Sequence, residues 1–335
     1  MAGPRGRARR RAWSRIAPGA DASPGGAMRV LVTGAAGFIG ANLCRELATY
    51  PAITGIVGLD DLSTGYAGNL DRTDTELVTG SVLDQQLVAE LVADADAVVH
   101  LAARPSVTRS LQDPVASHEV NATGSLYVLE ACRQRSVYVV AASSSSVYGS
   151  VPTLPKNEDL ATRPLSPYAA SKLAAEAYLL AYGAAFGLPS LALRFFNVYG
   201  PMQAAGHAYA AVIPAFIDAA LRRKPLIING DGQQTRDFTF VGTVVDVLAK
   251  AVVRRVASAY PVNLAFGTRV PIIEVAQRIA DVTGRPVDIR HGPVRPGDVR
   301  DSQADCDRLQ ELFSDAKPID LDTGLERTVE WFRGC

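Results

Sequence analysis

The sequence predicts an α/β protein, built on a doubly wound parallel sheet with a smaller, discontinuous C-terminal lobe. Apolar strand-like runs alternate with helical stretches through the first two hundred residues, and a glycine-rich turn joins the first run to the first helical stretch. After residue 197 the alternation loosens, and Gly, Pro and polar residues cluster at 200–208, 229–235 and 292–303. Nearly continuous apolar strands with helices between them are typical of a parallel sheet covered on both faces.

Six strands are expected in chain order, at residues 28–32, 56–59, 76–78, 97–101, 137–141 and 191–195. Helices are expected from the glycine turn to about residue 50, at 123–134, and at about 242–257, where the chain returns to the sheet. We therefore place a main domain at residues 28–197 together with about 236–262. A second lobe comprises about 198–235 and 263–335. Ligands bind at the carboxyl ends of the strands in open sheets of this kind.

The composition argues against several classes of protein. The chain has 335 residues, 48% of them apolar, and a formal net charge of zero. No apolar run approaches the roughly 20 residues that a membrane span needs. Without net charge, there is no overall attraction to nucleic acid. The four cysteines are widely spaced and the four histidines form no ligand pattern, so we expect free thiols, a cytoplasmic protein and no metal site.

The first 27 residues differ from the rest of the chain. They contain six arginines and one acidic residue, Asp21, and they show no apolar periodicity. They also lack the apolar region of a secretory signal. We expect a disordered Arg-rich tail, or a true start at Met28. A nucleic-acid-binding or targeting arm is the alternative.

A glycine loop follows the first expected strand. Gly34, Gly37 and Gly40 allow the backbone to turn tightly and approach a pyrophosphate, which the N-terminus of the next helix attracts. Asp60 ends the second strand, twenty residues after Gly40. A carboxylate there accepts hydrogen bonds from the ribose hydroxyls of NAD and repels the 2′-phosphate of NADP. The loop and Asp60 predict a Rossmann-type domain that binds NAD.

Tyr168 and Lys172 are four residues apart in an expected helix, so they share one face. A phenol with a pKa near 10 is a poor base at neutral pH. A nearby ammonium group and the positive nicotinamide ring can lower that pKa. Four serines at 143–146 follow the fifth strand, where a hydroxyl such as that of Ser144 can share a proton with a substrate oxygen.

Seven motifs lie along the chain: TGAAGFIG at 33–40, VHLAA at 99–103, SSSSVYG at 143–149, YAASK at 168–172, LRFFNVYGP at 193–201, GDGQQTRDF at 230–238 and RPGD at 295–298. With these motifs the chain resembles the extended short-chain dehydrogenase/reductase family, and within it the NAD-dependent nucleotide-sugar epimerases and dehydratases. The resemblance runs from about residue 28 to the C-terminus.

The resemblance implies roles for particular residues. Tyr168 would take the proton from the sugar 4-hydroxyl, Lys172 would hold the nicotinamide ribose, and Ser144 would hydrogen-bond the same sugar oxygen. NAD would contact Gly34, Gly37, Phe38, Ile39, Gly40, Asp60, Ser81, Val82, Leu101, Ala102, Ala103, Tyr168 and Lys172. The UDP-sugar would contact Ser106, Ser143, Ser145, Asn197, Ala211, Val212, Phe216, Ile228, Asn229, Arg236, Arg295, Asp298 and Ser302. The diphosphate would lie at Asn197, Arg236 and Arg295.

Members of the family differ in the step that comes after oxidation at C4. The 4,6-dehydratases carry an Asp-Glu pair just after the catalytic Ser or Thr, and the UDP-glucuronate decarboxylases keep a Glu at the second position. Here Ser145 and Ser146 occupy these positions, and serine is a poor acid or base. We therefore expect a 4-epimerase, with decarboxylation and dehydration as alternatives. A redox-inert NAD-binding scaffold is an alternative of another class, although such proteins usually lose the Tyr or the Lys.

The resemblance also bears on substrate and assembly. Some galactose epimerases carry a bulky Tyr four residues after the R-x-G-D motif, where this chain has Ser302. A small residue leaves room for a 2-acetamido group, so UDP-glucose/UDP-galactose or UDP-GlcNAc/UDP-GalNAc is the expected substrate pair. UDP-glucuronate is the alternative, because the serine cluster can hydrogen-bond a carboxylate. The family commonly forms homodimers through the Tyr-bearing helix and the preceding one, so a homodimer is expected.

Overall fold

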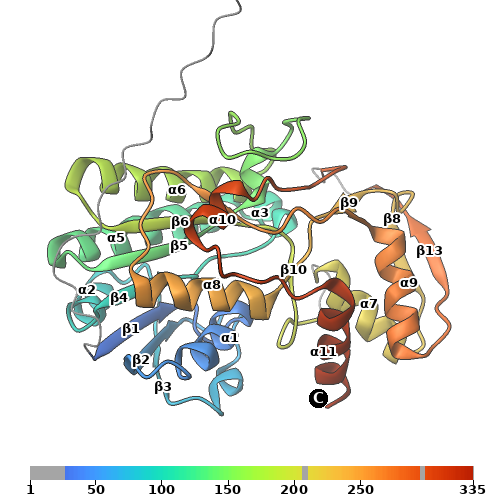
Figure 1. Ribbon diagram of the computed structural model, residues 1–335, viewed down its shortest axis with the longest axis horizontal. Coiled ribbons are helices and arrows are strands. Elements are labelled where there is room, and N and C mark those ends of the chain that lie inside the picture. Colours follow the sequence, from blue (N-terminus) through green and yellow to red (C-terminus); the bar gives the residue numbers. More distant parts are fainter. Residues whose placement is uncertain (1–26, 206–209, 295–298, 335) are drawn as a thin grey trace, which may run out of the picture.

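The computed structural model describes residues 27–205, 210–294 and 299–334 (Figure 1). The tail expected over the first 27 residues lies outside these ranges except for its last residue. The described chain forms a central sheet with helices on both faces and a second group of helices and short strands beside it, drawn at the right of Figure 1.

The central sheet has seven strands, in the order β11-β6-β5-β4-β1-β2-β3, and every neighbouring pair is parallel. The strands are β1 (Met28–Thr33), β2 (Ile53–Asp60), β3 (Thr75–Thr79), β4 (Ala97–His100), β5 (Tyr138–Ser144), β6 (Ser190–Phe195) and β11 (Val262–Leu264). The predicted fold class is confirmed. The short edge strand β11 was not expected from the sequence, because the polar Asn263 occupies its centre.

Successive residues of the inner strands point to opposite faces of the sheet, as a pleated strand requires. Val30 and Val32 of β1 pack into the core shared with α1 (Phe38–Leu47) and α8 (Val241–Arg254). Leu31, between them, packs into the core on the other face, with α2 (Gln85–Ala93), α5 (Gly124–Arg135) and α6 (Pro167–Phe186). Burial on both faces explains why these strands are apolar throughout.

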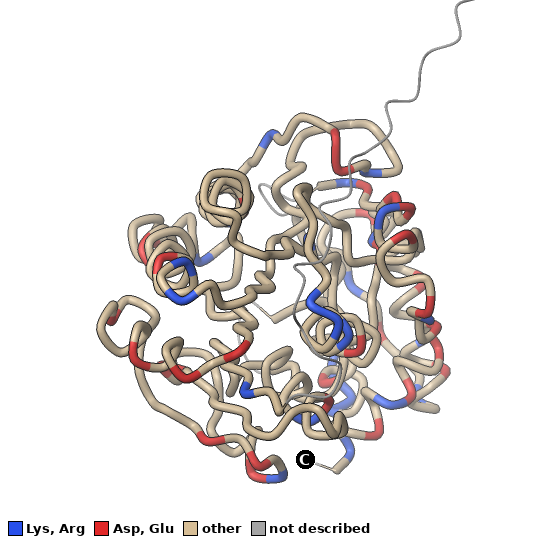
Figure 2. Tube along the Cα trace, turned by 60° about the vertical axis from the view of Figure 1, so that its left-hand side comes forward, with Lys and Arg blue, Asp and Glu red and all other residues tan. Residues whose placement is uncertain are grey.

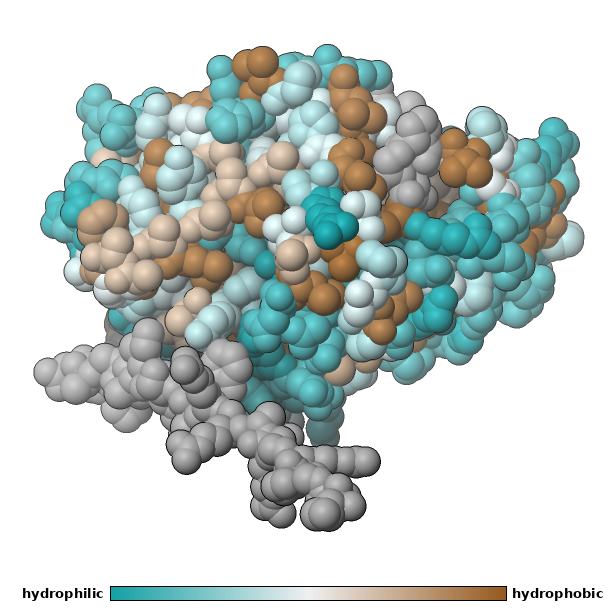
Figure 3. Space-filling model, turned by 90° about the horizontal axis from the view of Figure 1, so that it is seen from above, coloured by the Kyte–Doolittle hydropathy of each residue, from teal (hydrophilic) through white to brown (hydrophobic). Residues whose placement is uncertain are grey.

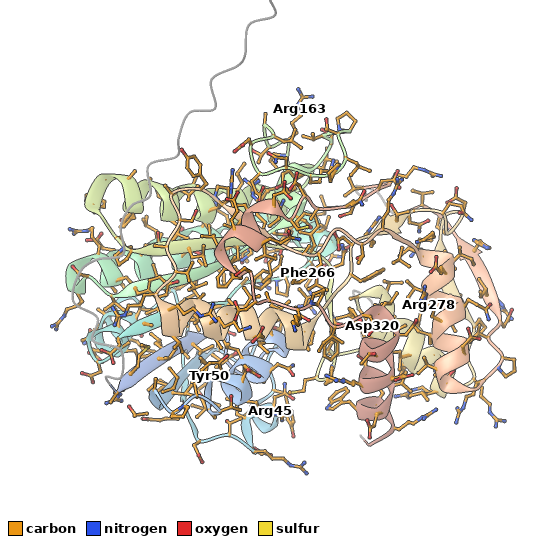
Figure 4. All side chains as sticks on the ribbon, in the orientation of Figure 1. Arg45, Tyr50, Arg163, Phe266, Arg278 and Asp320 are labelled. Carbon is orange, nitrogen blue, oxygen red and sulfur yellow. The ribbon has the colours of Figure 1, made fainter. Side chains whose placement is uncertain are left out.

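The second lobe contains α7 (Val212–Leu221), β8 (Leu226–Asn229), α9 (Ile272–Thr283), β13 (Ile289–Gly292) and α11 (Leu321–Arg333). β8 and β13 form a parallel pair. An ion pair of 2.6 Å between Arg278 and Asp322 joins α9 to α11. Figure 4 labels Arg278 on α9 and Asp320, which caps the start of α11.

The remaining elements are short. They are η1 (Ala67–Leu70), α3 (Val107–Gln112), α4 (Pro114–His118), η2 (Glu119–Thr123), η3 (Ser145–Tyr148), β7 (Val198–Tyr199), β9 (Thr235–Arg236), β10 (Thr239–Phe240), β12 (Val270–Pro271) and α10 (Asp307–Leu312). Basic and acidic residues are interspersed along the outer helices (Figure 2). Within the described ranges, none of the helices combines the length and apolarity needed to cross a membrane.

Candidate active site

A cavity of about 510 Å³ lies at the carboxyl ends of the sheet strands. Ligand cavities in proteins commonly have volumes of this size. Its lining includes these residues expected at the site: Gly34, Gly37, Phe38, Ile39, Gly40, Asp60, Val82, Leu101, Ala102, Ala103, Ser143, Ser144, Ser145, Tyr168, Lys172, Asn197, Arg236 and Ser302. One cavity therefore contains the glycine loop, the Tyr-Lys pair and the expected sugar end.

The glycine loop is packed so closely that side chains would not fit in it. Gly34 has a φ of +73°, a conformation that favours glycine. A Cβ atom added to Gly40 would lie 2.1 Å from the carbonyl oxygen of Gly34. Gly37 caps α1 without any side-chain hydrogen bond, so the first-turn N–H groups of α1 are left for a ligand. The loop therefore fits a pyrophosphate held by backbone N–H groups at a helix N-terminus.

Asp60 is fixed at the end of β2. Its carboxylate accepts hydrogen bonds from the N–H groups of Ala36 and Leu62, each at 2.9 Å. Burial raises the pKa of Asp60, and these backbone hydrogen bonds oppose the rise. The side chain lies in the cavity next to Asp61, a local charge that disfavours the extra phosphate of NADP. The residues present therefore fit NAD.

The Tyr-Lys pair lies at the start of α6. Ser166 caps this helix by accepting the N–H of Ala169 at 3.2 Å, which places Tyr168 in the first turn and Lys172 one turn later. The Lys172 ammonium donates to the carbonyl oxygen of Ala142 at 2.8 Å. Burial lowers the pKa of Lys172 to about 8. The helix thus directs both side chains to the end of β5.

Two opposing effects act on the pKa of Tyr168. Burial raises the pKa of its phenol, while the hydrogen bond with Ser144 acts in the opposite direction. The protein's own groups alone therefore do not lower this pKa, and the expected lowering depends on the positive nicotinamide ring as well. The reason is that burial disfavours the phenolate more than the hydrogen bond favours it. The positive nicotinamide ring is the remaining source of phenolate stabilisation.

The four serines after β5 have different surroundings. Ser143 donates its hydroxyl to the Glu176 carboxylate at 2.6 Å and is buried, so its hydroxyl is directed toward α6. Ser144 accepts hydrogen bonds from both the N–H group and the hydroxyl of Ser146. Ser145 lies in the cavity wall. The cluster therefore presents hydroxyl groups beside Tyr168, without a carboxylate among them.

Three residues form the expected sugar and diphosphate end of the cavity. Asn197 donates its amide to the carbonyl oxygen of Asp237 at 3.1 Å, and Arg236 donates to the carbonyl oxygens of Thr235 and Arg300. The Ser302 N–H group donates to the carbonyl oxygen of Thr235 at 3.1 Å. The backbone around β9 thus holds Arg236 and Ser302 in one wall of the cavity.

Several expected contact residues do not line this cavity: Ser81, Ser106, Ala211, Val212, Phe216, Ile228 and Asn229. Phe216 and Ile228 belong to the apolar core of the second lobe. The Ser106 hydroxyl caps α3 by accepting the N–H of Arg109 at 3.2 Å. Arg295 and Asp298 lie outside the described residues. For all of these, contact with a ligand stays a prediction.

The sequence did not lead us to predict Lys156 as a site residue, although it lies in the cavity wall. Only 4% of the residue is exposed. Its N–H group donates to the carbonyl oxygen of Gln303 at 2.7 Å, and its ammonium donates to the carbonyl oxygen of Val151. Burial lowers its pKa, and the nearby Asp301 opposes this. A lysine in a polar loop carries no sequence sign of burial, because lysines in loops are usually exposed.

Comparisons with known proteins show which family the chain is similar to. The model of the "NAD dependent epimerase/dehydratase family" matches residues 30–265. A "UDP-glucose 4-epimerase" from Mycolicibacterium smegmatis is 38% identical, over 91% of this chain and 99% of its own length. The solved structure of a UDP-N-acetylglucosamine 4-epimerase from Methanobrevibacter ruminantium has a TM-score of 0.87 and 33% identity, covering 92% of this chain and 99% of that one.

A Thermus thermophilus UDP-glucose 4-epimerase, solved in complex with NAD, has a TM-score of 0.84 and 35% identity, and covers 92% of this chain and 100% of that one. The predicted family, fold class and cofactor are confirmed. The chain therefore belongs to the NAD-dependent epimerase/dehydratase family and is an NAD-dependent enzyme of the extended short-chain dehydrogenase/reductase type.

Proposed function

We propose that the protein is a UDP-sugar 4-epimerase, acting on UDP-glucose/UDP-galactose or UDP-GlcNAc/UDP-GalNAc. The observation that carries this proposal is the wall of the cavity beside Tyr168. It contains Ser144, Ser145 and Ser146, where a dehydratase would need a carboxylic acid and a carboxylate. Asp301, a carboxylate elsewhere in the lining, is held by Thr235 and Arg269. The wall thus supports proton exchange at one oxygen better than elimination of water.

Three side chains of this chain carry the reaction. Tyr168 takes the proton from the sugar 4-hydroxyl and returns it after the sugar has turned over. Ser144, hydrogen-bonded to Tyr168, holds the same oxygen. Lys172 lies one helical turn from Tyr168, where its ammonium, bonded to the Ala142 carbonyl, would hold the nicotinamide ribose. When bound, NAD would supply the hydride acceptor for C4 and the source of the returning hydride, so it would not be consumed.

The size of Ser302 supports both neutral sugars. Its side chain is small, and it lines the same cavity as Tyr168 and Lys172. A tyrosine at this position would occupy cavity volume that a 2-acetamido group needs. The serine therefore supports UDP-GlcNAc as a substrate without excluding UDP-glucose.

UDP-glucuronate is the second candidate, and Lys156 is the observation that favours it. The Lys156 ammonium is buried in the same wall as Ser302, and its N–H group is bonded to the residue after Ser302. A cation at the sugar end attracts a C6 carboxylate. The serine cluster supports this candidate less than expected, because the hydroxyl of Ser143 is bonded to Glu176.

The test is to incubate the enzyme with UDP-glucose, UDP-GlcNAc and UDP-glucuronate in separate reactions and to read the C4 configuration by NMR. We expect inversion of the two neutral sugars. A Lys156→Met variant should then leave their KM values within about twofold, since the ammonium is bonded to the Val151 carbonyl oxygen and a neutral sugar has no charge for it to pair with. If UDP-glucuronate alone is inverted, and Lys156→Met raises its KM, the second candidate replaces the first.

We also propose a homodimer formed through α6. This helix has 20 residues, and its two charged side chains, Lys172 and Glu176, are both buried. Its exposed face consists of alanines and aromatic residues, with Tyr178 43% and Phe186 56% exposed. Figure 3 shows the molecule of Figure 1 from above. Tan and brown residues are frequent on the left of this view, the side on which Figure 1 draws α6. An uncharged helix face of this length suits a second copy of the same helix.

A further inference from the structure

Three consecutive residues at the end of β5 contact three residues on one face of α6. The Ala142 carbonyl accepts from Lys172 at 2.8 Å, Ser143 donates to Glu176 at 2.6 Å, and Ser144 hydrogen-bonds Tyr168. Tyr168, Lys172 and Glu176 are spaced four residues apart, so they lie along one side of the helix. Two of these contacts involve the reaction side chains. The third, between Ser143 and Glu176, has no role in the proposed reaction.

The Glu176 carboxylate is also held from β6. Arg194 donates to it twice, from Nε at 2.9 Å and from Nη2 at 2.6 Å, and both side chains are at most 4% exposed. Ser143 and Arg194 are register partners in the β5–β6 pair, so their side chains reach Glu176 from neighbouring strands. This bidentate geometry is rigid as well as charged. One carboxylate on α6 thus joins the ends of two strands.

The Arg194 guanidinium extends the network beyond the strands. It lies over the ring of Tyr148, 4.7 Å from the ring centre, and donates to the carbonyl oxygen of Glu158 at 3.3 Å. The Tyr148 hydroxyl in turn donates to the side chain of Asn263 in β11 at 2.6 Å. The segment that carries Lys156 is therefore connected to the same group of buried side chains.

We propose that Ser143, Glu176 and Arg194 form a positioning clamp for the reaction, and that Ser143 is a positioning residue instead of a substrate contact. The clamp fixes the end of β5 against α6, and so sets the distance between the Ser144 hydroxyl and the Tyr168 phenol. This inference rests on the proposed function, in which those two groups act on the sugar 4-hydroxyl. A buried ion pair is a weak source of stability, whereas a small misplacement of a reacting group is costly for the rate.

The Ser143→Ala variant tests the clamp, because it leaves the Glu176–Arg194 ion pair intact. We expect kcat to fall roughly ten- to a hundredfold with KM for the UDP-sugar unchanged, since the reacting groups are misaligned while binding is kept. The acidic limb of the pH–rate profile should move to higher pH, because a weakened Ser144 hydrogen bond stabilises the phenolate less. Ser143→Thr, which keeps the hydroxyl, should restore both readouts.

Ser190→Ala is the matched control. Ser190 is as buried as Ser143, at 5% exposure, and lies at the opposite end of β6 from the cavity. This variant should leave kcat and the pH profile unchanged. If Ser143→Ala raises KM and leaves kcat unchanged, Ser143 is a substrate contact and the clamp is wrong. If it changes only the melting temperature, the contact is purely structural and the clamp is also wrong.

A second readout separates the clamp from the proposed function. Phenolate absorbance of the NAD-loaded enzyme, taken as the difference from Tyr168→Phe, isolates Tyr168 among the 11 tyrosines. Ser143→Ala should shift this ionisation to higher pH even if no UDP-sugar is epimerised. If the wild-type protein inverts none of the sugars, the proposed function is wrong. If the Tyr168 ionisation in Ser143→Ala occurs at the same pH as in the wild type, the clamp is wrong.

Discussion

Burial acts in opposite directions on the two titratable side chains of the catalytic face. It raises the pKa of the Tyr168 phenol and lowers the pKa of the Lys172 ammonium to about 8. Both changes disfavour the charged form, as expected for groups removed from water. The proton on Tyr168 is therefore held firmly by the protein alone. The positive charge of bound NAD is the natural counterweight, which links proton removal to cofactor binding.

At this scale the Tyr168→Phe variant is the decisive substitution. It removes the hydroxyl that exchanges a proton with the sugar and keeps the ring that packs at the start of α6. We expect turnover to fall by a factor of about 10² to 10⁴, the usual contribution of a general acid or base. NAD should remain bound, as measured by the cofactor released from denatured protein. Turnover within a few-fold of wild type would remove Tyr168 from the mechanism.

At the scale of elements, the structure shows which features the sequence could predict. β1 to β6 each contain a short apolar run, and the glycine loop and YAASK motif lie close to such runs, so their residues come together at one sheet edge. β11 was missed, because three residues centred on Asn263 give no apolar run. The burial of Lys156 was not predicted, because a loop has no hydrophobic periodicity from which burial can be inferred. The bond from Ser143 to Glu176 was also missed, because the sequence does not show that the two residues lie side by side.

The glycine loop and α1 allow a test of cofactor binding. A Gly40→Ala substitution would put a Cβ atom 2.1 Å from the Gly34 carbonyl oxygen and 2.8 Å from the Ala35 Cα atom. Backbone must move to relieve this contact, at a cost of about 1–3 kcal/mol. We expect NAD affinity, measured by calorimetry, to fall at least about tenfold, since the pyrophosphate depends on this backbone.

Gly183→Ala is a suitable control for that substitution. Gly183 lies in α6, and a Cβ atom there would meet its nearest neighbour, the Ser190 hydroxyl, at 3.4 Å. Alanine is also favoured over glycine in a helix interior. The control should bind NAD normally. If Gly40→Ala also binds NAD normally, the loop does not hold the pyrophosphate in the way described.

At the scale of the whole molecule, Asp237 joins segments that are far apart in the chain. Its carboxylate accepts from the N–H groups of Gly267 and Ala304 and from the hydroxyl of Thr268, and it is fully buried. Burial raises its pKa from 3.8 to about 6, against the effect of these hydrogen bonds. Protonation of Asp237 is therefore easier in the folded protein than in the unfolded chain, and it takes place below about pH 6.

The Asp237→Asn variant should show this in the pH dependence of stability. Because the folded-state pKa is raised, the contribution of Asp237 is fully present below about pH 3.8 and is lost as the pH rises through about 6. The asparagine oxygen can accept from the same two N–H groups without ionising. The free energy of unfolding of the variant relative to wild type should therefore rise by roughly 3 kcal/mol in total between about pH 3 and pH 7 and then level off. A difference that is constant with pH in urea unfolding would contradict this.

The proposed homodimer is also a property of the whole molecule. Tyr178→Glu places a charge on the exposed face of α6, where nearly half of the tyrosine is accessible. We expect this variant to be monomeric in light-scattering measurements at concentrations where wild type is dimeric, because burying an unpaired carboxylate is costly. Ile227→Glu, at a somewhat more exposed apolar position in β8, should keep the wild-type mass. Dimers of unchanged stability in Tyr178→Glu would place the interface elsewhere.

The measurement that tests the central claim most directly is NMR of UDP-glucose and UDP-GlcNAc incubated with the enzyme in D₂O. If C4 is oxidised and reduced by the same hydride, the inverted product keeps protium at C4. We predict inversion at C4 with no deuterium there, while Tyr168→Phe gives no inversion. Deuterium at C4, a 4-keto-6-deoxy product, or no inversion of either sugar would contradict the account.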